Sequence, residues 1–337
     1  MKTALVGLGR MGFRHLQVLR ELMLDVVGVC DVLDAARTQA RESGIPQDRI
    51  FSDFYFMIKE VQPELVVVAS TAPSHENIVC HATSQGARAI LCEKPMSVSL
   101  ASCDRMIAAC KTAGTHLAIN HQMRFMEQYT WAKAVTSASA FGGLSSVSVV
   151  AGNFGMAMNG SHYFEMFRYM TDEVPVRVAA WFSSDSVANP RGVQFEDRAG
   201  TVRLETPSGK RFYMDASTDH GHGMHVTYAG PKGRLDIDEL AGCARLTQRK
   251  PEYSTLPTTR YGMPWDTLER KFTPTDAVTP TRAVMRALIE GDNYPDGSVG
   301  LLACELLVAA YLSHEVGGET LDLRNTKLPR ERIFPWA

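Results

Sequence analysis

A glycine-rich hexapeptide near the N-terminus is the first segment whose residue types and spacing indicate chemistry. Gly7-Leu8-Gly9-Arg10-Met11-Gly12 directly follows the apolar run Lys2–Val6 and directly precedes apolar residues at helical spacing. In such a loop the first glycine permits a tight turn and the second lets the backbone approach a pyrophosphate. The third lets helix and strand pack closely, with the helix N-terminus facing the phosphates. A plain turn is the alternative, but the strand before the loop and the helix after it favour a dinucleotide site.

A carboxylate follows at the position where the ribose of a bound dinucleotide would need one. Asp31 comes 19 residues after Gly12 and ends the β-branched run Asp25–Cys30. A carboxylate there can accept both ribose hydroxyls and repels a 2′-phosphate, so the sequence favours NAD over NADP. Arg10 and Arg37 are nearby cations that keep NADP possible. The alternative role for Asp31 is to cap a helix or turn.

The elements that must position these residues alternate between strand and helix over the first 120 residues. Short apolar runs predict buried strands, and helical spacing predicts the helices between them. Strands are expected at Lys2–Val6, Asp25–Cys30, Glu64–Ala69, Ala89–Cys92 and Thr115–Asn120, and helices at Met11–Leu22, Asp34–Ser43, Ser74–Gln85 and Ser99–Ala113. Repeated strand–helix–strand units predict right-handed crossovers and a doubly wound parallel sheet.

After about residue 122 the pattern changes to strands joined by glycine, proline or serine turns. Strands are expected at Ser145–Gly152, Val174–Ser183, Gly200–Glu205, Arg211–Ala216, His225–Tyr228 and Gly233–Ile237, and helices at Ser161–Met170, Thr281–Gly291 and Ser298–Ser313. This pattern predicts an α+β domain built on a large, mostly antiparallel open sheet. The predicted fold class is therefore α/β, with a Rossmann dinucleotide-binding domain over residues 1–122 and a second domain over residues 123–337.

A lysine stands at the sheet edge where open parallel sheets bind their ligands. Lys94 lies in Glu93-Lys94-Pro95, directly after the expected strand Ala89–Cys92, and the proline stops that strand. The alternative is an ordinary surface lysine at a strand end. Three motifs occur in order, with matching spacings: Gly7-x-Gly9-x-x-Gly12, Thr71-Ala72-Pro73 before His75, and Glu93-Lys94-Pro95.

Together these motifs resemble the Gfo/Idh/MocA family of NAD(P)-dependent oxidoreductases, which includes glucose–fructose oxidoreductase and inositol dehydrogenase. The resemblance covers essentially the whole chain and includes the strand–turn–strand segment 228–237. It implies a nicotinamide cofactor, a substrate-binding and oligomerisation domain after the Rossmann domain, and a polyhydroxylated substrate such as a sugar, sugar derivative or cyclitol. It also implies a homodimer or homotetramer, because the open sheet of that family mediates assembly.

The resemblance implies two sets of contact residues. The expected cofactor contacts are Gly7, Gly9, Arg10, Met11, Gly12, Asp31, Ser70, Thr71, Pro73, His75, Glu93, Lys94 and Gln122. The expected substrate contacts are Lys94, Arg124, Asn159, His162 and Tyr163. Lys94 would touch both the reacting hydroxyl and the nicotinamide ribose. The alternative for Arg124 is a salt bridge at the domain boundary.

His162 matches the histidine of a family motif in which an aspartate precedes the histidine near the start of a helix. Met158 occupies the aspartate position and cannot accept a proton, and Asn159 beside it is neutral, so an Asp–His relay is not expected. A histidine suits base catalysis near neutral pH, and an ammonium stabilises negative charge on the reacting oxygen. We therefore predict His162 as the acid/base and Lys94 as its electrostatic partner. A structural histidine at the helix start is the alternative.

Other clusters support rival functions less well. A metal site is suggested by His220, His222 and His225. Alternation along a strand places His225 on the opposite face, however, so no metal is predicted. A non-catalytic NAD(P)-binding regulator could use the same fold, and Met158 favours it, whereas the presence of both Lys94 and His162 argues for an enzyme. A reductase of a non-sugar substrate is the third possibility.

Composition sets the remaining bounds. The 337 residues suggest two domains, and 45% hydrophobic and 21% charged residues are ordinary for a globular protein. A net charge of −2 gives no basic field for nucleic acid or an anionic membrane, so neither is an expected partner. The seven cysteines are scattered without a Cys-x-x-Cys pair, and neither a signal peptide nor a membrane span is recognised. A cytoplasmic protein is expected.

Overall fold

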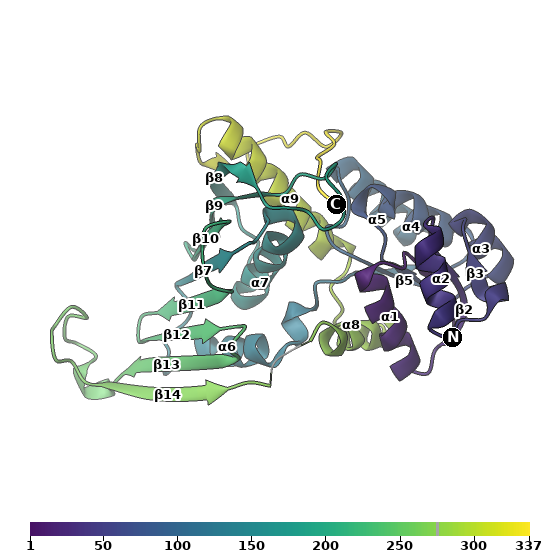
Figure 1. Cartoon of the computed structure of the whole chain (residues 1–337). Coiled ribbons are helices and arrows are strands. Elements are labelled where there is room, and N and C mark those ends of the chain that lie inside the picture. The colour runs from purple at the N-terminus through teal and green to yellow at the C-terminus, as the bar shows by residue number, and fades with distance from the viewer. Residues whose placement is uncertain (274–275) are drawn as a thin grey trace.

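The computed structural model describes residues 1–273 and 276–337 and contains two sheets, one in each half of the molecule (Figure 1). The first sheet has six strands in the order β3-β2-β1-β4-β5-β6. The second has nine strands in the order β14-β13-β12-β11-β7-β10-β9-β8-β15. The predicted fold class is confirmed, because the first sheet is parallel and the second is mostly antiparallel.

The first sheet is a doubly wound Rossmann sheet whose central strands are buried except for Lys2 at the start of the first. Its strands are β1 (Lys2–Val6), β2 (Asp25–Cys30), β3 (Ile50–Phe51), β4 (Leu65–Val68), β5 (Ala89–Cys92) and β6 (His116–Ile119). Its helices are α1 (Arg10–Glu21), α2 (Asp34–Glu42), α3 (Phe54–Val61), α4 (His75–Ser84) and α5 (Leu100–Ala113), with short 3-10 turns η1 (Gln47–Arg49) and η2 (Ala72–Ser74). The strand order reverses next to β1, which places a crevice at the carboxyl ends of β1 and β4.

A connecting segment leads from the first sheet to the second. It consists of the 3-10 turn η3 (Gln122–Phe125) and the helix α6 (Glu127–Ser137). The strands of the second sheet are β7 (Ser146–Gly152), β8 (Arg177–Ser186), β9 (Arg198–Glu205), β10 (Arg211–Ser217), β11 (His225–Gly230), β12 (Gly233–Asp238), β13 (Cys243–Arg249), β14 (Trp265–Lys271) and β15 (Leu321–Asp322). β7 and β10 pair in parallel and the other pairs are antiparallel. Between β13 and β14, η5 (Pro251–Tyr253) belongs to an arm that extends from the body (Figure 1).

Helices cover one face of the second sheet. A π-helical turn η4 (Met156–Gly160) precedes α7 (Ser161–Thr171), and α9 (Gly297–Glu315) lies beside α7. Side chains alternate along β10, so that Phe212 faces the helices and Tyr213 the open side. The ring of Phe212 packs at 5.4 Å from that of Phe167 and at 6.1 Å from that of Phe164, which anchors α7 on the sheet. This packing fixes the helix that carries His162.

One late helix packs on the Rossmann half. α8 (Val278–Glu290) lies against α1, and its buried Val284 and Met285 share a hydrophobic cluster with Leu16 and Leu19 of α1. Directly after α8, the backbone N–H of Ile119 at the edge of the first sheet donates to the Pro295 carbonyl at 2.8 Å. The division into two domains at residue 122 stays a prediction. The packing of α8 on α1 shows that the second half of the chain covers part of the first.

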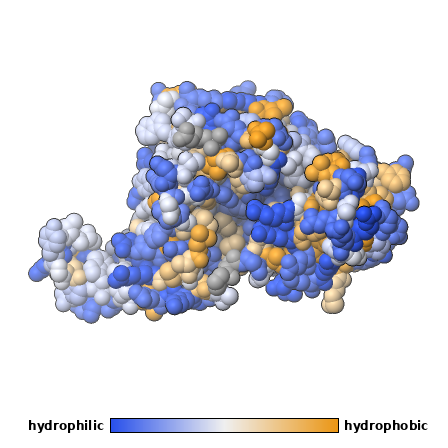
Figure 2. Space-filling view, viewed as in Figure 1, coloured by the Kyte–Doolittle hydropathy of each residue, from blue (hydrophilic) through white to orange (hydrophobic). Residues whose placement is uncertain are grey.

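α9 is long and apolar enough to cross a membrane by length and composition alone. In the structure 61% of its most apolar window is buried, and Leu306, Leu307 and Val308 are completely inaccessible, which is the pattern of a core helix. Figure 2 shows a mostly hydrophilic face with separate hydrophobic patches and an indentation where the two halves meet.

Candidate functional site

The glycine loop between β1 and α1 has room for a side chain at one glycine and no room at the other two. A Cβ on Gly7 would lie 2.5 Å from the backbone nitrogen of Ser70, and a Cβ on Gly12 would lie 2.0 Å from the carbonyl oxygen of Gly7. A Cβ on Gly9 would meet no atom within 4 Å. Gly9 is also the N-cap of α1, and no side chain of this residue caps the first N–H groups of that helix. Arg10 and Met11 begin the helix at this point. Such a terminus fits the pyrophosphate of a dinucleotide.

Asp31 lies directly beside this loop and is held there by backbone donors. Its Oδ2 accepts the N–H of Leu8 at 2.7 Å, and its Oδ1 accepts the N–H of Leu33 at 2.8 Å. The guanidinium of Arg37 donates to the carbonyls of Asp31 and Val32 at 2.7 and 2.9 Å. The Asp31 carboxylate is therefore fixed at the end of β2, and Arg37 holds the backbone on either side of the turn.

The loop from Ser70 to His75 follows β4 and contacts the segment after Lys94 through the side chain of His75. Ser70 and Thr71 open the loop, and Pro73 lies exposed in η2. His75 is buried, with Nε2 at 3.1 Å from the Ser70 carbonyl and Nδ1 at 3.2 Å from the Met96 carbonyl. Both ring nitrogens therefore lie on backbone acceptors, and His75 holds the loop in place rather than presenting a nitrogen to a ligand.

Glu93 anchors the segment that carries Lys94. Its Oε1 lies 2.7 Å from Nε2 of His15 and accepts Nδ2 of Asn120 at 2.7 Å. Burial raises the pKa of this carboxyl, but the contacts with His15, Lys94 and Asn120 outweigh burial and lower it to about 2. Glu93 is thus an ionised carboxylate with two partners on Oε1, and it lies next to Lys94 in the chain.

Lys94 bridges the two halves of the molecule. It precedes Pro95 through a cis peptide bond, and its Nζ donates a short hydrogen bond to the Met158 carbonyl in η4. Burial lowers the pKa of Lys94 to about 8, with Glu93 opposing that change and Arg191 adding to it. The ammonium is therefore mostly protonated at neutral pH but close to its titration point.

His162 lies in the first turn of α7, within electrostatic reach of Lys94. The side chain is buried, and the His121 ring meets it edge to face with centroids 5.5 Å apart. Burial, followed by the charges of Lys94 and His121, holds the pKa of His162 well below its usual range. The imidazole is therefore neutral at pH 7, which is the form that a general base requires.

Several buried polar atoms near Lys94 have no hydrogen-bond partner among the residues that the structure describes. They are Oδ1 of Asn120, both ring nitrogens of His121, Oε1 of Gln122 and Nδ1 of His162. Buried polar atoms are nearly always paired in proteins, so such a group marks a place where a ligand or water completes the pairing. These atoms follow β6, the neighbour of the strand that leads to Lys94, and meet the start of α7. The residues present fit a nicotinamide and a polar substrate.

The structure places Arg124 in an ion pair at the junction of the two halves. Its Nη2 forms a short contact with Oε1 of Glu165, and its guanidinium lies 5.7 Å from the centre of the Tyr169 ring. Arg168 also reaches Oε1 of Glu165, at 2.9 Å. The side chains of Arg124 and Glu165 are 8% and 1% exposed, so this arrangement corresponds to the salt-bridge alternative rather than to a free substrate contact.

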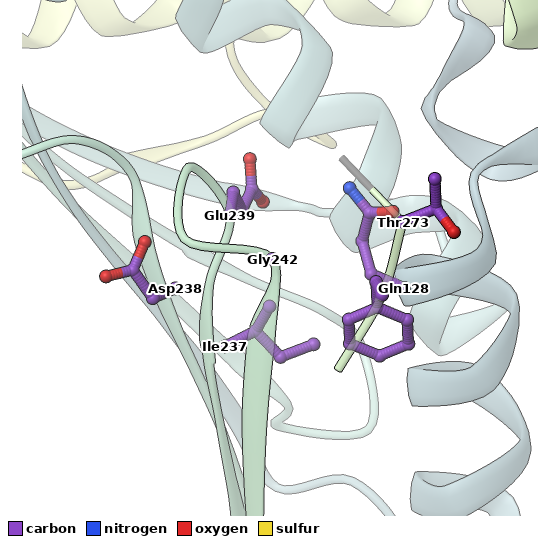
Figure 3. Close-up of a pocket in the computed structure, with 7 residues that line it drawn as sticks. Gln128, Ile237, Asp238, Glu239, Gly242 and Thr273 are labelled. Atoms are coloured by element: carbon purple, nitrogen blue, oxygen red, sulfur yellow. The ribbon is translucent and has the colours of Figure 1, made fainter. Parts of the chain in front are cut away.

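Tyr163 is also engaged within the protein. Its hydroxyl donates to Oε2 of Glu239 at 2.7 Å, and Tyr129 donates to the other oxygen. Figure 3 shows Glu239 at a small cavity that has room for about one water molecule. Asn159 stays partly buried in η4, next to the Met158 carbonyl that Lys94 contacts.

Three residues at the site have no place among the sequence predictions. His121 had a signal, because it lies between Asn120 and Gln122 at the expected edge. Asp197 and Arg191 had none, since they lie in the connection between β8 and β9. Asp197 is 1% exposed and accepts the N–H groups of Ala157 and Met158 at 2.8 and 2.9 Å.

The C-terminal residues brace the same region. The indole N–H of Trp336 donates to the Ser97 carbonyl at 3.0 Å, and the N–H of Glu196 donates to the Pro335 carbonyl at 2.8 Å. Arg191 donates to the backbone oxygen of Ala337 at 2.9 Å. These bonds tie the segment after Lys94 to the connection that carries Asp197.

The histidine cluster at the end of β10 has a different arrangement from an alternating strand. His220 and His222 lie in the loop before β11, with rings stacked 5.6 Å apart, and His225 begins β11. Over residues 1–273 and 276–337, no group of three or more His, Cys, Asp or Glu side chains is arranged to hold a metal.

Comparison with known proteins gives relatives for the whole length of the chain. Residues 1–121 match the family described as "Oxidoreductase family, NAD-binding Rossmann fold" (GFO_IDH_MocA). The chain is 26% identical to D-apiose dehydrogenase of Paraburkholderia graminis, over 96% of this chain and 90% of that protein. It is 22% identical to inositol 2-dehydrogenase of Salmonella typhimurium, over 76% of this chain and 78% of that protein.

A solved structure supports the same fold. An oxidoreductase from Agrobacterium radiobacter, solved with NAD+, L-tartaric acid and magnesium, matches with a TM-score of 0.79 at 19% identity, over 96% of this chain and 98% of that one. The predicted nicotinamide cofactor is confirmed at the level of the NAD-binding family, and the named relatives support an NAD-dependent dehydrogenase. Residues 1–121 thus match the NAD-binding Rossmann domain of the Gfo/Idh/MocA oxidoreductase family, which confirms the resemblance stated from the sequence for that part of the chain.

Proposed function

We propose that this chain transfers a hydride between NAD and a hydroxyl- or keto-bearing carbon of a sugar, sugar derivative or cyclitol. The observation that carries the proposal is the group of unpartnered buried polar atoms beside Lys94 at the edge of a Rossmann sheet. Hydroxyl groups of a polyhydroxylated molecule can donate to and accept from such atoms. The names of the D-apiose and inositol dehydrogenases support this substrate class.

The residues proposed to hold NAD form one continuous edge. The α1 N-terminus at Gly9 would take the pyrophosphate, and Asp31 would take the adenosine ribose. The loop Ser70–Pro73 would lie along the cofactor, with Gln122 and Lys94 at its nicotinamide end. When bound, NAD supplies the hydride-accepting ring, and the protein supplies position and electrostatics.

Lys94 and His162 divide the remaining chemistry. In the direction of oxidation, neutral His162 would accept the hydroxyl proton, and a bound nicotinamide would supply the acceptor for the hydride. The Lys94 ammonium stabilises the negative charge that develops on the oxygen. In the reverse direction His162 returns the proton. Neither role requires a carboxylate at Met158.

Steady-state turnover of variants tests these assignments. Each purified variant is mixed with NAD and a panel of sugars and cyclitols, and the reduced-nicotinamide absorbance band is followed. Lys94→Ala and His162→Ala should each lower kcat/KM by about 100-fold or more, the usual scale for loss of a positioned acid/base or electrostatic group. Lys111→Ala, on the exposed side of α5, is the matched control. Near-normal rates in both site variants would remove the assignment.

The same assay separates the rival functions when the panel also includes diols and dihydrodiols with NAD, and imines with NADH. Tight NAD binding without turnover of any compound would indicate the non-catalytic regulator. Turnover restricted to diols, imines or dihydrodiols would indicate the non-sugar reductase.

We also propose that the protein works as a homodimer or homotetramer in the cytoplasm. The uncovered face of the second sheet supports assembly, and the seven cysteines, all free thiols in the structure, fit a reducing compartment. Light scattering of the eluted protein tests the assembly, and a monomer across the working concentration range would contradict it.

A further inference from the structure

We propose that Asp197 is a positioning residue for Lys94, holding the η4 turn that supplies the lysine's hydrogen-bond acceptor and providing a buried negative charge beside the ammonium. The inference rests on the function proposed above. Asp197 lies outside the glycine-rich, Thr-Ala-Pro and Glu-Lys-Pro motifs.

The first step is the contact between Asp197 and η4. Both carboxylate oxygens accept backbone N–H groups, from Ala157 at 2.8 Å and from Met158 at 2.9 Å. A Cβ on Gly155 would lie 2.0 Å from Oδ2, so the carboxylate packs directly against the backbone at the start of the turn. Asp197 therefore fixes η4 from a segment about 40 residues away.

The second step is the connection from η4 to Lys94. Met158 takes part in both contacts. Its N–H donates to Asp197, and its carbonyl accepts Nζ of Lys94. The carboxylate and the ammonium are thus joined through a single residue, and a shift of η4 would move the acceptor away from Nζ. Because α7 begins directly after η4, the same shift would also displace His162.

The third step is the balance of charge around Lys94. The groups that act on its titration are Glu93 at the end of β5, Asp197, and the cations Arg191 and Arg10. Glu93 and Asp197 favour the charged ammonium, whereas burial, Arg191 and Arg10 disfavour it. Glu93 has the larger effect, and Asp197 is the second negative charge that favours the protonated lysine.

The state of Asp197 itself fits this role. Burial raises its pKa to about 6, while the two backbone N–H groups, Lys94 and Arg191 oppose that rise. The carboxylate is therefore ionised over the range in which Lys94 titrates. It is not a proton donor to the reaction, because its two oxygens are occupied by the backbone.

The competing explanation is that Asp197 only caps the η4 turn and has no electrostatic effect on Lys94. The titration of Lys94 distinguishes the two explanations. In cofactor-free protein, the rate of acetylation at Lys94 is measured against pH by mass spectrometry of the peptide, because only the neutral amine reacts. Asp197→Asn keeps the shape and one acceptor oxygen but removes the charge. It should lower the midpoint of labelling at Lys94 by about half a pH unit, which is about threefold faster labelling at neutral pH. Asp197→Glu should restore part of the wild-type midpoint.

The control must lose buried hydrogen bonds without changing charge near the site. Ser313→Ala serves, because its hydroxyl donates to the Glu319 carbonyl and accepts the Ala180 N–H in the core, and neither partner is at the site. An unchanged Lys94 midpoint in Asp197→Asn, with the same stability loss as Ser313→Ala, would overturn the proposal and leave Asp197 as a cap.

The activity measurement keeps this inference separate from the proposed function. If the wild type turns over a compound of the panel, the basic limb of the Lys94-dependent pH profile should move to lower pH in Asp197→Asn. If no compound is turned over, the proposed function fails, yet the labelling experiment still decides whether Asp197 controls Lys94.

Discussion

The carboxyl group of Glu239 should make the stability of this protein depend on pH in a direction opposite to that of most carboxylates. Burial raises its pKa to about 7, and the charge of Asp238 adds to the rise, although the hydroxyls of Tyr129 and Tyr163 oppose it. A carboxyl of pKa 4.5 in the unfolded chain then binds its proton more tightly in the fold. Its stabilising contribution is complete below about pH 4.5 and is lost as the pH rises through about 7.

The size of the effect follows from the change in pKa. A rise from 4.5 to about 7 corresponds to roughly 3 kcal/mol at about 1.4 kcal/mol per pH unit. Glu239→Gln removes the titration and can still accept one tyrosine hydroxyl. The free energy of unfolding of wild type minus that of the variant should therefore fall by about 2–3 kcal/mol between about pH 5 and about pH 8.5.

Urea unfolding at several pH values measures this difference, with fluorescence and circular dichroism required to give coincident transitions. The subtraction removes the contributions of other titrating groups, such as Asp197, since both proteins contain them. Glu290→Gln, on the exposed end of α8, controls for the loss of one carboxylate. Parallel curves for wild type and Glu239→Gln across this range would refute the reasoning, because the carboxyl would then have no preference for its proton in the fold.

Four further outcomes are expected. Gly9→Ala should leave the free energy of unfolding unchanged within about 0.5 kcal/mol and weaken NAD binding about tenfold in a calorimetric titration, because its Cβ has space only where the ligand is proposed. Gly12→Ala should lower the free energy of unfolding by about 1–3 kcal/mol or more, because its Cβ would lie 2.0 Å from a carbonyl oxygen. Equal stabilities of Gly9→Ala and Gly12→Ala would contradict this geometry. Arg124→Leu should destabilise the fold by about 3 kcal/mol in urea unfolding, because Glu165 is left buried with one arginine partner, and the double variant with Glu165→Met should recover part of that loss. Asp31→Asn should lower the ratio of NAD to NADP affinity about tenfold, and an unchanged ratio would mean that the carboxylate does not contact the ribose.

The sequence predicts those parts of the site that depend on the backbone of a short segment. Gly7 and Gly12 are required by a tight turn and a close helix contact within the same unit, so their spacing carries the information. Asp31 and Lys94 lie at the ends of strands whose apolar character is plain. The strands and helices expected before residue 121 are all present, with bounds shifted by a few residues at most.

The sequence does not predict the parts that depend on distant partners. The substrate contacts expected for Arg124 and Tyr163 stay predictions, but the sequence does not show that Glu165 pairs with Arg124. Nor does it show that Glu239, 76 residues beyond Tyr163, accepts the Tyr163 hydroxyl. Asp197 reaches η4 through a connection without regular structure, which no periodicity describes.

Elements with weak patterns were missed as well. β3 is only two residues long, α6 has little separation of polar and apolar faces, and β14 is largely exposed along the edge of the sheet. Their positions follow from the neighbours they pair with or cover, such as the β13 strand that pairs with β14. Each of these segments is too short or too polar for its pattern to be recognised from the sequence alone.

The return of α8 to the nucleotide-binding half has a consequence for the order of synthesis. The apolar face of α1 leaves the ribosome early, but its cover, including Val284 and Met285, is made more than 150 residues after β6. At roughly 5–20 residues per second, this interval lasts on the order of ten to thirty seconds. Throughout it the nascent nucleotide-binding half lacks the cover that α8 gives to α1, and that apolar surface is open to a chaperone.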